Sequence, residues 1–135
     1  MKTLLIAASL ATLGLATACG PTPRTPEQYR DDTKAVLDTK NNDIRACYDG
    51  VLQATPAVGG KVTVKFDVEI EGGKLVNIVV DKANTTAPDA VAACVTKSIT
   101  GLAIAPPDKY LGQGSFVWEF SFPGPGVYSS PAPKS

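Results

Sequence analysis

The chain has no histidine among its 135 residues, and this absence limits the chemistry that it can perform. Histidine is a frequent general acid or base in enzymes and a common metal ligand. The sequence also lacks a glycine-rich phosphate-binding loop, so an active site would need a cluster of Asp, Glu or Lys side chains. No such cluster stands out in the sequence, and we expect neither an enzyme nor a protein that holds a cofactor or a metal.

An excess of positive charge is absent as well. The chain has 13 Lys and Arg against 13 Asp and Glu, and Lys2 is the only charged residue before Cys19. Nucleic acids and anionic lipids attract proteins through clustered positive charge. We therefore expect no nucleic-acid partner, and attachment to a membrane would have to come from another feature.

That feature is Cys19, which follows a segment typical of a signal peptide over residues 1–18. Lys2 precedes an apolar run from Leu4 to Leu15 that is too short to span a membrane, and the small residues Ala16-Thr17-Ala18 follow it. The segment resembles a bacterial lipobox, in which the cysteine becomes the lipid-bearing first residue. We expect a palmitate-bearing lipoprotein anchored through Cys19, with ordinary signal cleavage as the alternative.

The rest of the chain divides into a tether, one domain and a tail. Residues 19–26 contain three prolines and are expected to form a short lipidated tether. Residues 27–123 are expected to form one small domain, and residues 124–135 a disordered tail. Gly20, rather than Asp, follows the cysteine, which in lipoprotein sorting patterns indicates the outer membrane. We therefore expect a domain in the bacterial cell envelope that faces the periplasm.

Cys47 and Cys94 remain as a pair once Cys19 carries a lipid. An exported compartment favours oxidation, and we expect the two to form one disulfide. Metal binding and a reactive thiol are the alternatives. Neither fits well, because the cysteines lie far apart in sequence, have no CxxC partner and have no histidine to join them.

Apolar periodicity predicts the order helix, strand, strand, helix, strand. The helices are expected over residues 27–53 and from Pro88 to about Gly101, and the strands over residues 62–70, 75–81 and 116–122. The residues expected to face the core are Leu37, Ile44, Cys47, Tyr48, Val51, Val62, Val64, Phe66, Val68, Ile70, Val76, Ile78, Val80, Val91, Cys94, Val95, Ser98, Leu102, Phe116, Trp118, Phe120 and Phe122. In the second strand, the face that carries Leu75 and Val79 is the alternative. Polar residues such as Thr63 alternate with the apolar ones in the first strand and are expected to face water.

This order predicts an α+β fold, in which two helices cover one face of a three-stranded antiparallel or mixed sheet and are stapled by the disulfide. A right-handed crossover through the second helix would place the first strand in the centre and the third at an edge. An exposed edge invites another strand, so the third strand is the predicted partner-binding edge. Its residues are Phe116, Val117, Trp118, Glu119 and Phe120. Its aromatic face is interpreted as core packing rather than as a ligand platform.

The sequence resembles the TonB C-terminal-like domains, and among them the AgmX/PglI C-terminal domains, on three motifs. These are Ile44-Arg45-Ala46-Cys47-Tyr48, Gly60-Lys61-Val62-Thr63-Val64-Lys65-Phe66 followed by Gly72-Gly73-Lys74-Leu75, and Val91-Ala92-Ala93-Cys94-Val95. The resemblance covers residues 41–122 and implies a paired CY and CV cysteine couple in the two helices. The chain departs from the family in having no long linker and no spanning helix, so energy transduction of the TonB kind is not implied.

Two classes of function remain open at this point. The first is a lipid-anchored periplasmic domain that binds or scaffolds a protein partner in an envelope assembly, such as one for motility or transport. It would do so by accepting an extended peptide on its sheet edge. The second is a lipoprotein that binds a small ligand or the cell wall on its open sheet face. Fold alone does not decide between them.

Overall fold

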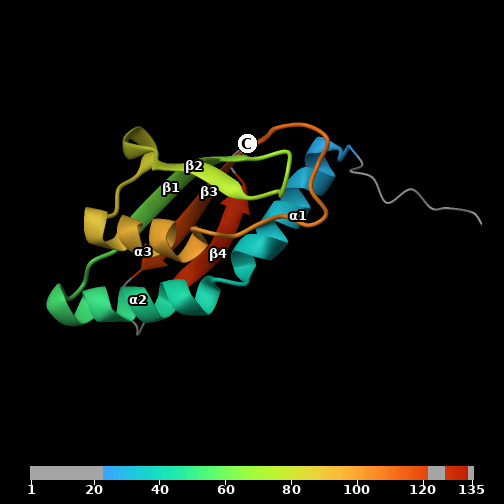
Figure 1. Cartoon of the computed structure of the whole chain (residues 1–135). Helices are drawn as coiled ribbons and strands as arrows, with labels where there is room; N and C mark the ends of the chain where they lie inside the picture. Colours follow the sequence, from blue (N-terminus) through green and yellow to red (C-terminus); the bar gives the residue numbers. More distant parts are fainter. Residues whose placement is uncertain (1–22, 122–126, 134–135) are drawn as a thin grey trace, which may run out of the picture.

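The computed structural model of the chain describes residues 23–121 and 127–133. Its elements, in chain order, are α1 (Pro26–Asp38), α2 (Asn41–Ala54), β1 (Gly60–Val68), β2 (Leu75–Val80), the short 3₁₀ helix η1 (Lys82–Asn84), α3 (Asp89–Ile99), β3 (Gly112–Ser121) and β4 (Val127–Pro133) (Figure 1). The predicted α+β class is confirmed, with one α-helix, one short 3₁₀ helix and one strand more than the sequence led us to expect.

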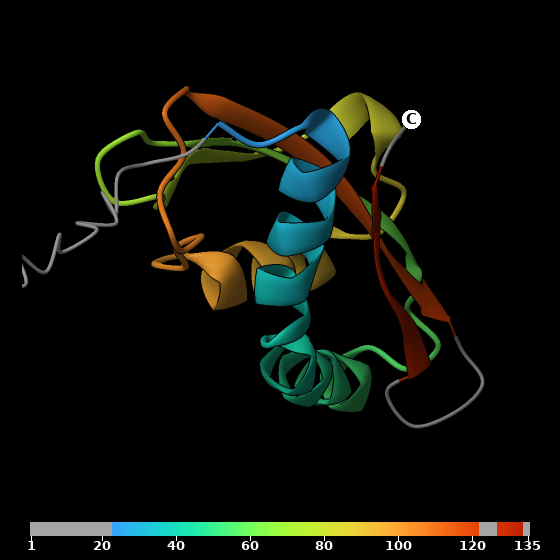
Figure 2. The same ribbon diagram turned by 90° about the vertical axis from the view of Figure 1, so that its right-hand side faces the viewer.

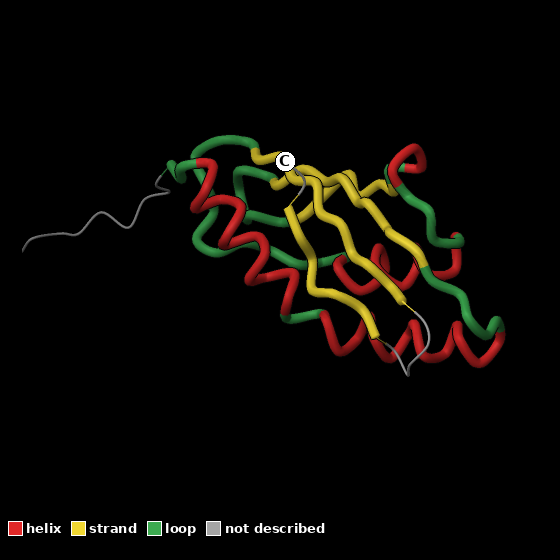
Figure 3. Tube along the Cα trace, turned by 180° about the vertical axis from the view of Figure 1, so that it is seen from behind, coloured by secondary structure: helices red, strands yellow, loops and turns green. Residues whose placement is uncertain are grey.

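The four strands form one antiparallel sheet in the order β2-β1-β3-β4. The sheet curves around the three α-helices, which lie together on its concave side (Figure 2). Seen from behind, the opposite face carries no α-helix in the described part of the chain (Figure 3). Because β1 lies between β2 and β3, its predicted central position is confirmed. The core between the two layers is built from Leu37, Ile44, Tyr48, Val62, Val64, Phe66, Val68, Val91, Val95, Ile99, Phe116, Trp118 and Phe120, with smaller contributions from their neighbours.

Strand β1 follows its predicted alternation closely, with two exceptions. Val62, Val64, Phe66 and Val68 are buried, but Ile70 is exposed because the strand ends at Val68 and a turn follows. Thr63 is buried rather than water-facing. The cause is the segment after β2, because the Thr63 hydroxyl donates to the Asn84 carbonyl at 2.8 Å and the Thr63 amide donates to Thr85 Oγ1 at 3.0 Å.

Strand β2 pairs with β1 as a hairpin, as predicted, but an irregularity divides it. The register shifts between Lys65 and Asp67, and Asn77 on the facing strand has a φ of 51°. An extra residue in one strand reverses the alternation of side chains beyond it. Val76, predicted to face the core, therefore shares the open face with its partner Asp67, whereas Ile78 and Val80 pack against the core.

The single helix predicted over residues 27–53 is wrong, because α1 ends at Asp38 and α2 begins at Asn41. Thr39 closes α1, since its hydroxyl donates to the Val36 carbonyl at 2.6 Å, a local bond that competes with continuation of the helix. The break lets α1 lie against β3 and β4 while α2 lies against α3.

The tail predicted to be disordered over residues 124–135 contains β4, so this prediction is wrong for Val127–Pro133. Pro131 and Pro133 lie in β4, which is the outermost strand beside β3. A proline cannot donate to a second neighbouring strand, and an edge strand does not need that donor. The prolines are thus compatible with pairing on one side only.

Candidate functional site

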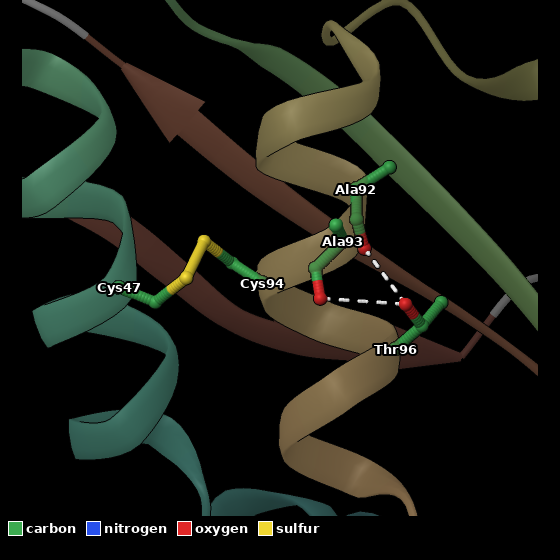
Figure 4. Close-up of a disulfide and its surroundings, with 5 residues drawn as sticks. All are labelled: Cys47, Ala92, Ala93, Cys94 and Thr96. Atoms are coloured by element: carbon green, nitrogen blue, oxygen red, sulfur yellow. Dashed lines mark hydrogen bonds between the residues drawn. A yellow bond between two sulfur atoms is a disulfide. The ribbon is translucent and has the colours of Figure 1, made fainter. Parts of the chain in front are cut away.

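The Cys47–Cys94 disulfide is present and joins α2 to α3, as predicted (Figure 4). The two Cα atoms are 5.6 Å apart, the usual separation for such a bridge. Cys94 is buried, as predicted, whereas Cys47 was predicted to face the core and instead lies on the exposed side of α2. The bridge therefore fixes the outer helix α2 to α3, which itself packs on β1 and β2.

The third strand is not the edge of the sheet, which corrects the predicted partner-binding strand. β3 pairs with β1 on one side and with β4 on the other. Of the five residues predicted to bind a partner, Phe116, Trp118 and Phe120 are buried in the core. Val117 and Glu119 alternate with them along β3, and both have Cα partners in β4. The exposed backbone row that the prediction required is occupied by β4.

The available edge is β2, the outermost strand at the other side of the sheet. The Asp81 amide donates to the Thr63 carbonyl at 2.8 Å, so the two-residue alternation of an antiparallel pair turns the backbone groups of Ile78 and Val80 away from β1. Among the described residues, no backbone hydrogen bond outside the sheet involves these two positions. Val79, between them, has 54% of its surface exposed.

The beginning of the same edge is covered. The Leu75 amide donates to the Leu102 carbonyl at 2.9 Å, and an isolated bridge joins Lys74 to Ala103. The uncovered length thus runs from the irregularity at Asn77 to Val80. It offers a short stretch of backbone rather than a full strand.

A groove of about 760 Å³ lies on the open face beside this edge. Polar side chains from three strands line it, with Lys65 and Asp67 from β1, Asn77 from β2, and Gln113 and Ser115 from β3. Two of these are tied together, because the Asn77 amide donates to Asp67 at 2.8 Å. Lys65 pairs with Asp81 at 2.8 Å. The groove therefore combines these polar side chains with Phe66 and Val79.

A second, smaller cavity of about 370 Å³ lies between the first turns of α1 and the beginning of β3. The hydroxyl oxygens of Tyr29 and Ser115, both among its lining residues, are buried and have no hydrogen-bond partner among the described residues. The Tyr29 ring fits against the beginning of β3 because position 112 is a glycine. A Cβ atom at this position would lie 1.7 Å from the phenolic oxygen of Tyr29. Burial, and then the charge of Asp108, raise the pKa of Tyr29 above its usual value.

Asp108 forms the polar centre of this region. One carboxylate oxygen accepts from the Arg24 amide at 2.9 Å and the other accepts from the Tyr110 amide at 3.0 Å. Burial alone would raise the pKa of Asp108, but backbone hydrogen bonds from Tyr110, Arg24 and Lys109 and the charge of Arg24 outweigh it and hold the pKa below its usual value. The Arg24 guanidinium also donates to the Pro106 carbonyl at 2.7 Å.

Sequence reasoning did not identify this cluster. Arg24 lies in the segment predicted as a tether, and no role was predicted for Asp108. The available signal was the pair Gly112 and Gly114 directly before an aromatic strand, because glycine in a strand often marks the close approach of another group. Here the approaching groups are the rings of Tyr29 and Phe66.

Three further observations concern the predicted anchor and chemistry. Cys19 and Phe122 lie outside the described residues. Over residues 23–121 and 127–133, no group of three or more His, Cys, Asp or Glu side chains is placed to hold a metal. No helix in the same residues is long and apolar enough to cross a membrane.

The fold and the disulfide define a small α+β domain whose second helix is covalently tied to its third. Comparison with protein-family models, with curated proteins and with solved structures finds no match to this chain. The TonB C-terminal-like resemblance accordingly stays a prediction from three sequence motifs.

Proposed function

We propose that this chain is a lipid-anchored periplasmic binding domain that accepts an extended segment of an envelope protein on the β2 edge. The single observation that carries the proposal is the uncovered stretch from Asn77 to Val80, where outward backbone groups flank the exposed Val79 side chain. Addition of a strand to such an edge supplies main-chain hydrogen bonds, and adjacent side-chain pockets supply specificity.

The groove on the open face supports this proposal because it adjoins the same edge. A strand added beside β2 would place alternate side chains on the open face and on the helical face. Side chains on the open face would meet Val79 and the polar groups of Lys65 and Asn77. A partner segment with alternating apolar and polar residues suits this surface. The opposite edge is less suited, because Pro131 and Pro133 remove donors from β4.

The proposal is tested by crosslinking in the native envelope. A photoreactive amino acid at Val79 should give an adduct with one envelope protein, which mass spectrometry identifies. The same amino acid at Glu119, which is exposed near the other end of β3 and lies outside the groove, is the matched control. Adducts of equal yield at both positions, or none at Val79, would contradict binding at the β2 edge.

Two substitutions at Val80 then separate the backbone from the side chain. Val80→Pro removes the outward donor, whereas Val80→Ala shortens the side chain and keeps the donor. Both variants lose packing of Val80 against the core, so both should unfold at a somewhat lower temperature than the wild type. We expect the adduct from Val79 to disappear only in Val80→Pro, while circular dichroism shows that both variants are folded. Equal adduct yields in the two folded variants would sink the proposal.

Binding of a small ligand is the second candidate function, and the cavity beside α1 favours it. Tyr29, at the wall of this cavity, has a buried hydroxyl with no partner among the described residues, and natural proteins pair most such groups. The same crosslinking experiment distinguishes the two functions, since a small-ligand protein requires no protein adduct at Val79. An enzyme is not proposed.

A further inference from the structure

Large apolar side chains gather at one end of the sheet. Tyr110 and Leu111 precede β3 and expose 62% and 58% of their surface, and Ile70 exposes 48% in the turn after β1. Val68 pairs with Gly112, so Ile70 and Tyr110 both lie just beyond the paired ends of neighbouring strands. Figure 1 shows the β1–β2 turn, the loop before β3 and the beginning of α1 together at this end. We call Ile70, Lys109, Tyr110 and Leu111 the apolar tip.

The chain enters the domain at the same end. The Arg24 amide donates to Asp108, and the Arg24 guanidinium donates to the Pro106 carbonyl. The loop that carries the tip is therefore hydrogen-bonded to Arg24, just before α1. The Tyr110 amide donates to the other oxygen of Asp108 at 3.0 Å. One carboxylate thus connects the tether to the tip.

The length of the tether limits how far the tip can lie from the proposed anchor. Five residue steps separate Cys19 from Arg24, and an extended chain covers at most about 17 Å over that length. This inference rests on the proposed lipid at Cys19. We propose that the apolar tip lies in the membrane interface, where Tyr110, Leu111 and Ile70 contact lipid and fix the orientation of the domain on the bilayer.

The chemistry of the tip suits a lipid surface. Tyrosine is enriched where a membrane meets water, and a lysine can bury its methylene groups while its charge stays wet. The Lys109 ammonium lies 5.9 Å from the Tyr110 ring centroid. Lys74 and Lys109 are offset by Glu69 and Glu71 in the neighbouring turn. Contact between the apolar tip and the membrane should therefore depend on burial of its apolar side chains rather than on the presence of anionic lipids.

This orientation leaves the proposed binding edge accessible. The uncovered part of β2 begins at Asn77 and continues away from the tip, because Leu75 is the residue of β2 that pairs with Val68 at the tip end. A domain resting on its tip would present Val79 and Val80 to the periplasm rather than to lipid. The two surfaces can thus work at the same time.

Fluorescence quenching in vesicles tests the proposal on the full chain, purified from membranes. Tyr110→Trp places a reporter on the tip, and Glu119→Trp places one at the other end of β3, where Glu119 pairs with Lys61. The native Trp118 is fully buried and supplies a constant background. In phosphatidylcholine vesicles with brominated acyl chains, we expect at least about twofold stronger quenching for Tyr110→Trp than for Glu119→Trp.

The anchor and the contact are read separately. The mass of the N-terminal peptide reports whether Cys19 is acylated, and the quenching ratio reports whether the tip touches lipid. An acylated protein with equal quenching at both positions would overturn the tip contact and leave the anchor intact. A protein without an acyl group would overturn the anchor, and with it the contact that depends on it. If the tip binds a protein instead, Tyr110→Trp in pure lipid vesicles stays unquenched, which also overturns the proposal.

Discussion

Asp108 is the residue on which two segments far apart in the chain depend. Its side chain has 5% exposure, and both oxygens accept backbone hydrogen bonds, one from Arg24 and one from Tyr110. A carboxylate can accept from both donors, whereas an asparagine must turn its own NH₂ group toward one of them. This makes the charge, and not only the shape, of the residue important for the tether end of the domain.

We expect Asp108→Asn to lower the free energy of unfolding at pH 7 by about 1–3 kcal/mol, the usual cost of an unsatisfied buried donor. The folded pKa of Asp108 lies below its usual value. Its stabilisation is therefore complete above the unfolded pKa of about 4 and is lost as the pH falls through the folded pKa. Urea unfolding of wild type and variant at several pH values measures the difference, which should shrink below about pH 4.

Asp31→Asn is the matched control, because Asp31 is exposed on α1 and pairs with its neighbour Arg30 in a surface contact. A surface substitution of this kind should change the free energy of unfolding by no more than about 0.5 kcal/mol. A difference between wild type and Asp108→Asn that is the same at every pH would contradict the assigned role of the carboxylate.

At the scale of elements, the disulfide is the covalent link between α2 and α3. It closes a loop between residues separated by 47 positions. We expect replacement of both cysteines by alanine to lower the free energy of unfolding by about 4 kcal/mol, the chain-entropy value for a loop of this length. Chemical unfolding of the double variant measures this. Recovery of two freely alkylated thiols from protein taken from its native envelope would show that the bridge does not form there.

The elements also show where the sequence was a sufficient guide. Strand β1 was predictable because Val62, Val64, Phe66 and Val68 alternate with polar residues, and one buried face is enough to specify a strand and its register. The cysteine pair was predictable from its number and from the expected oxidising compartment. These features depend on local pattern or on simple counting.

Other elements depend on contacts that a local pattern does not contain. Leu37 and Ile44 are both buried and seven residues apart, so the apolar stripe continues across the break at Thr39 and conceals it. Pro131 and Pro133 are typical of a tail, and they are tolerated in β4 only because that strand needs donors on one side. The partner-binding edge was predicted on the wrong strand for the same reason. β4 was predicted to be a tail, but it covers β3 and leaves β2 as the available edge.

At the scale of the whole molecule, the proposed anchor decides where every other surface can act. We expect Cys19→Ser to abolish incorporation of labelled palmitate and to release the domain from the membrane fraction, because none of the described helices could replace the lipid by spanning the bilayer. Fractionation of cells and detection of the label in the purified protein measure the two effects. Continued labelling and membrane retention of this variant would show that Cys19 does not carry the anchor.

The position of the disulfide along the chain has a consequence for the order of assembly. Both cysteines precede β3 and β4, and the loop that they close contains the whole β1–β2 hairpin. If the chain is exported from its N-terminus, as proposed, Cys47 and Cys94 would reach the oxidising compartment before Gly112 emerges. The disulfide could then form before β3, the aromatic strand that completes the core, has been exported. β4, which follows β3 in the chain, would pair with the remaining edge of β3 last.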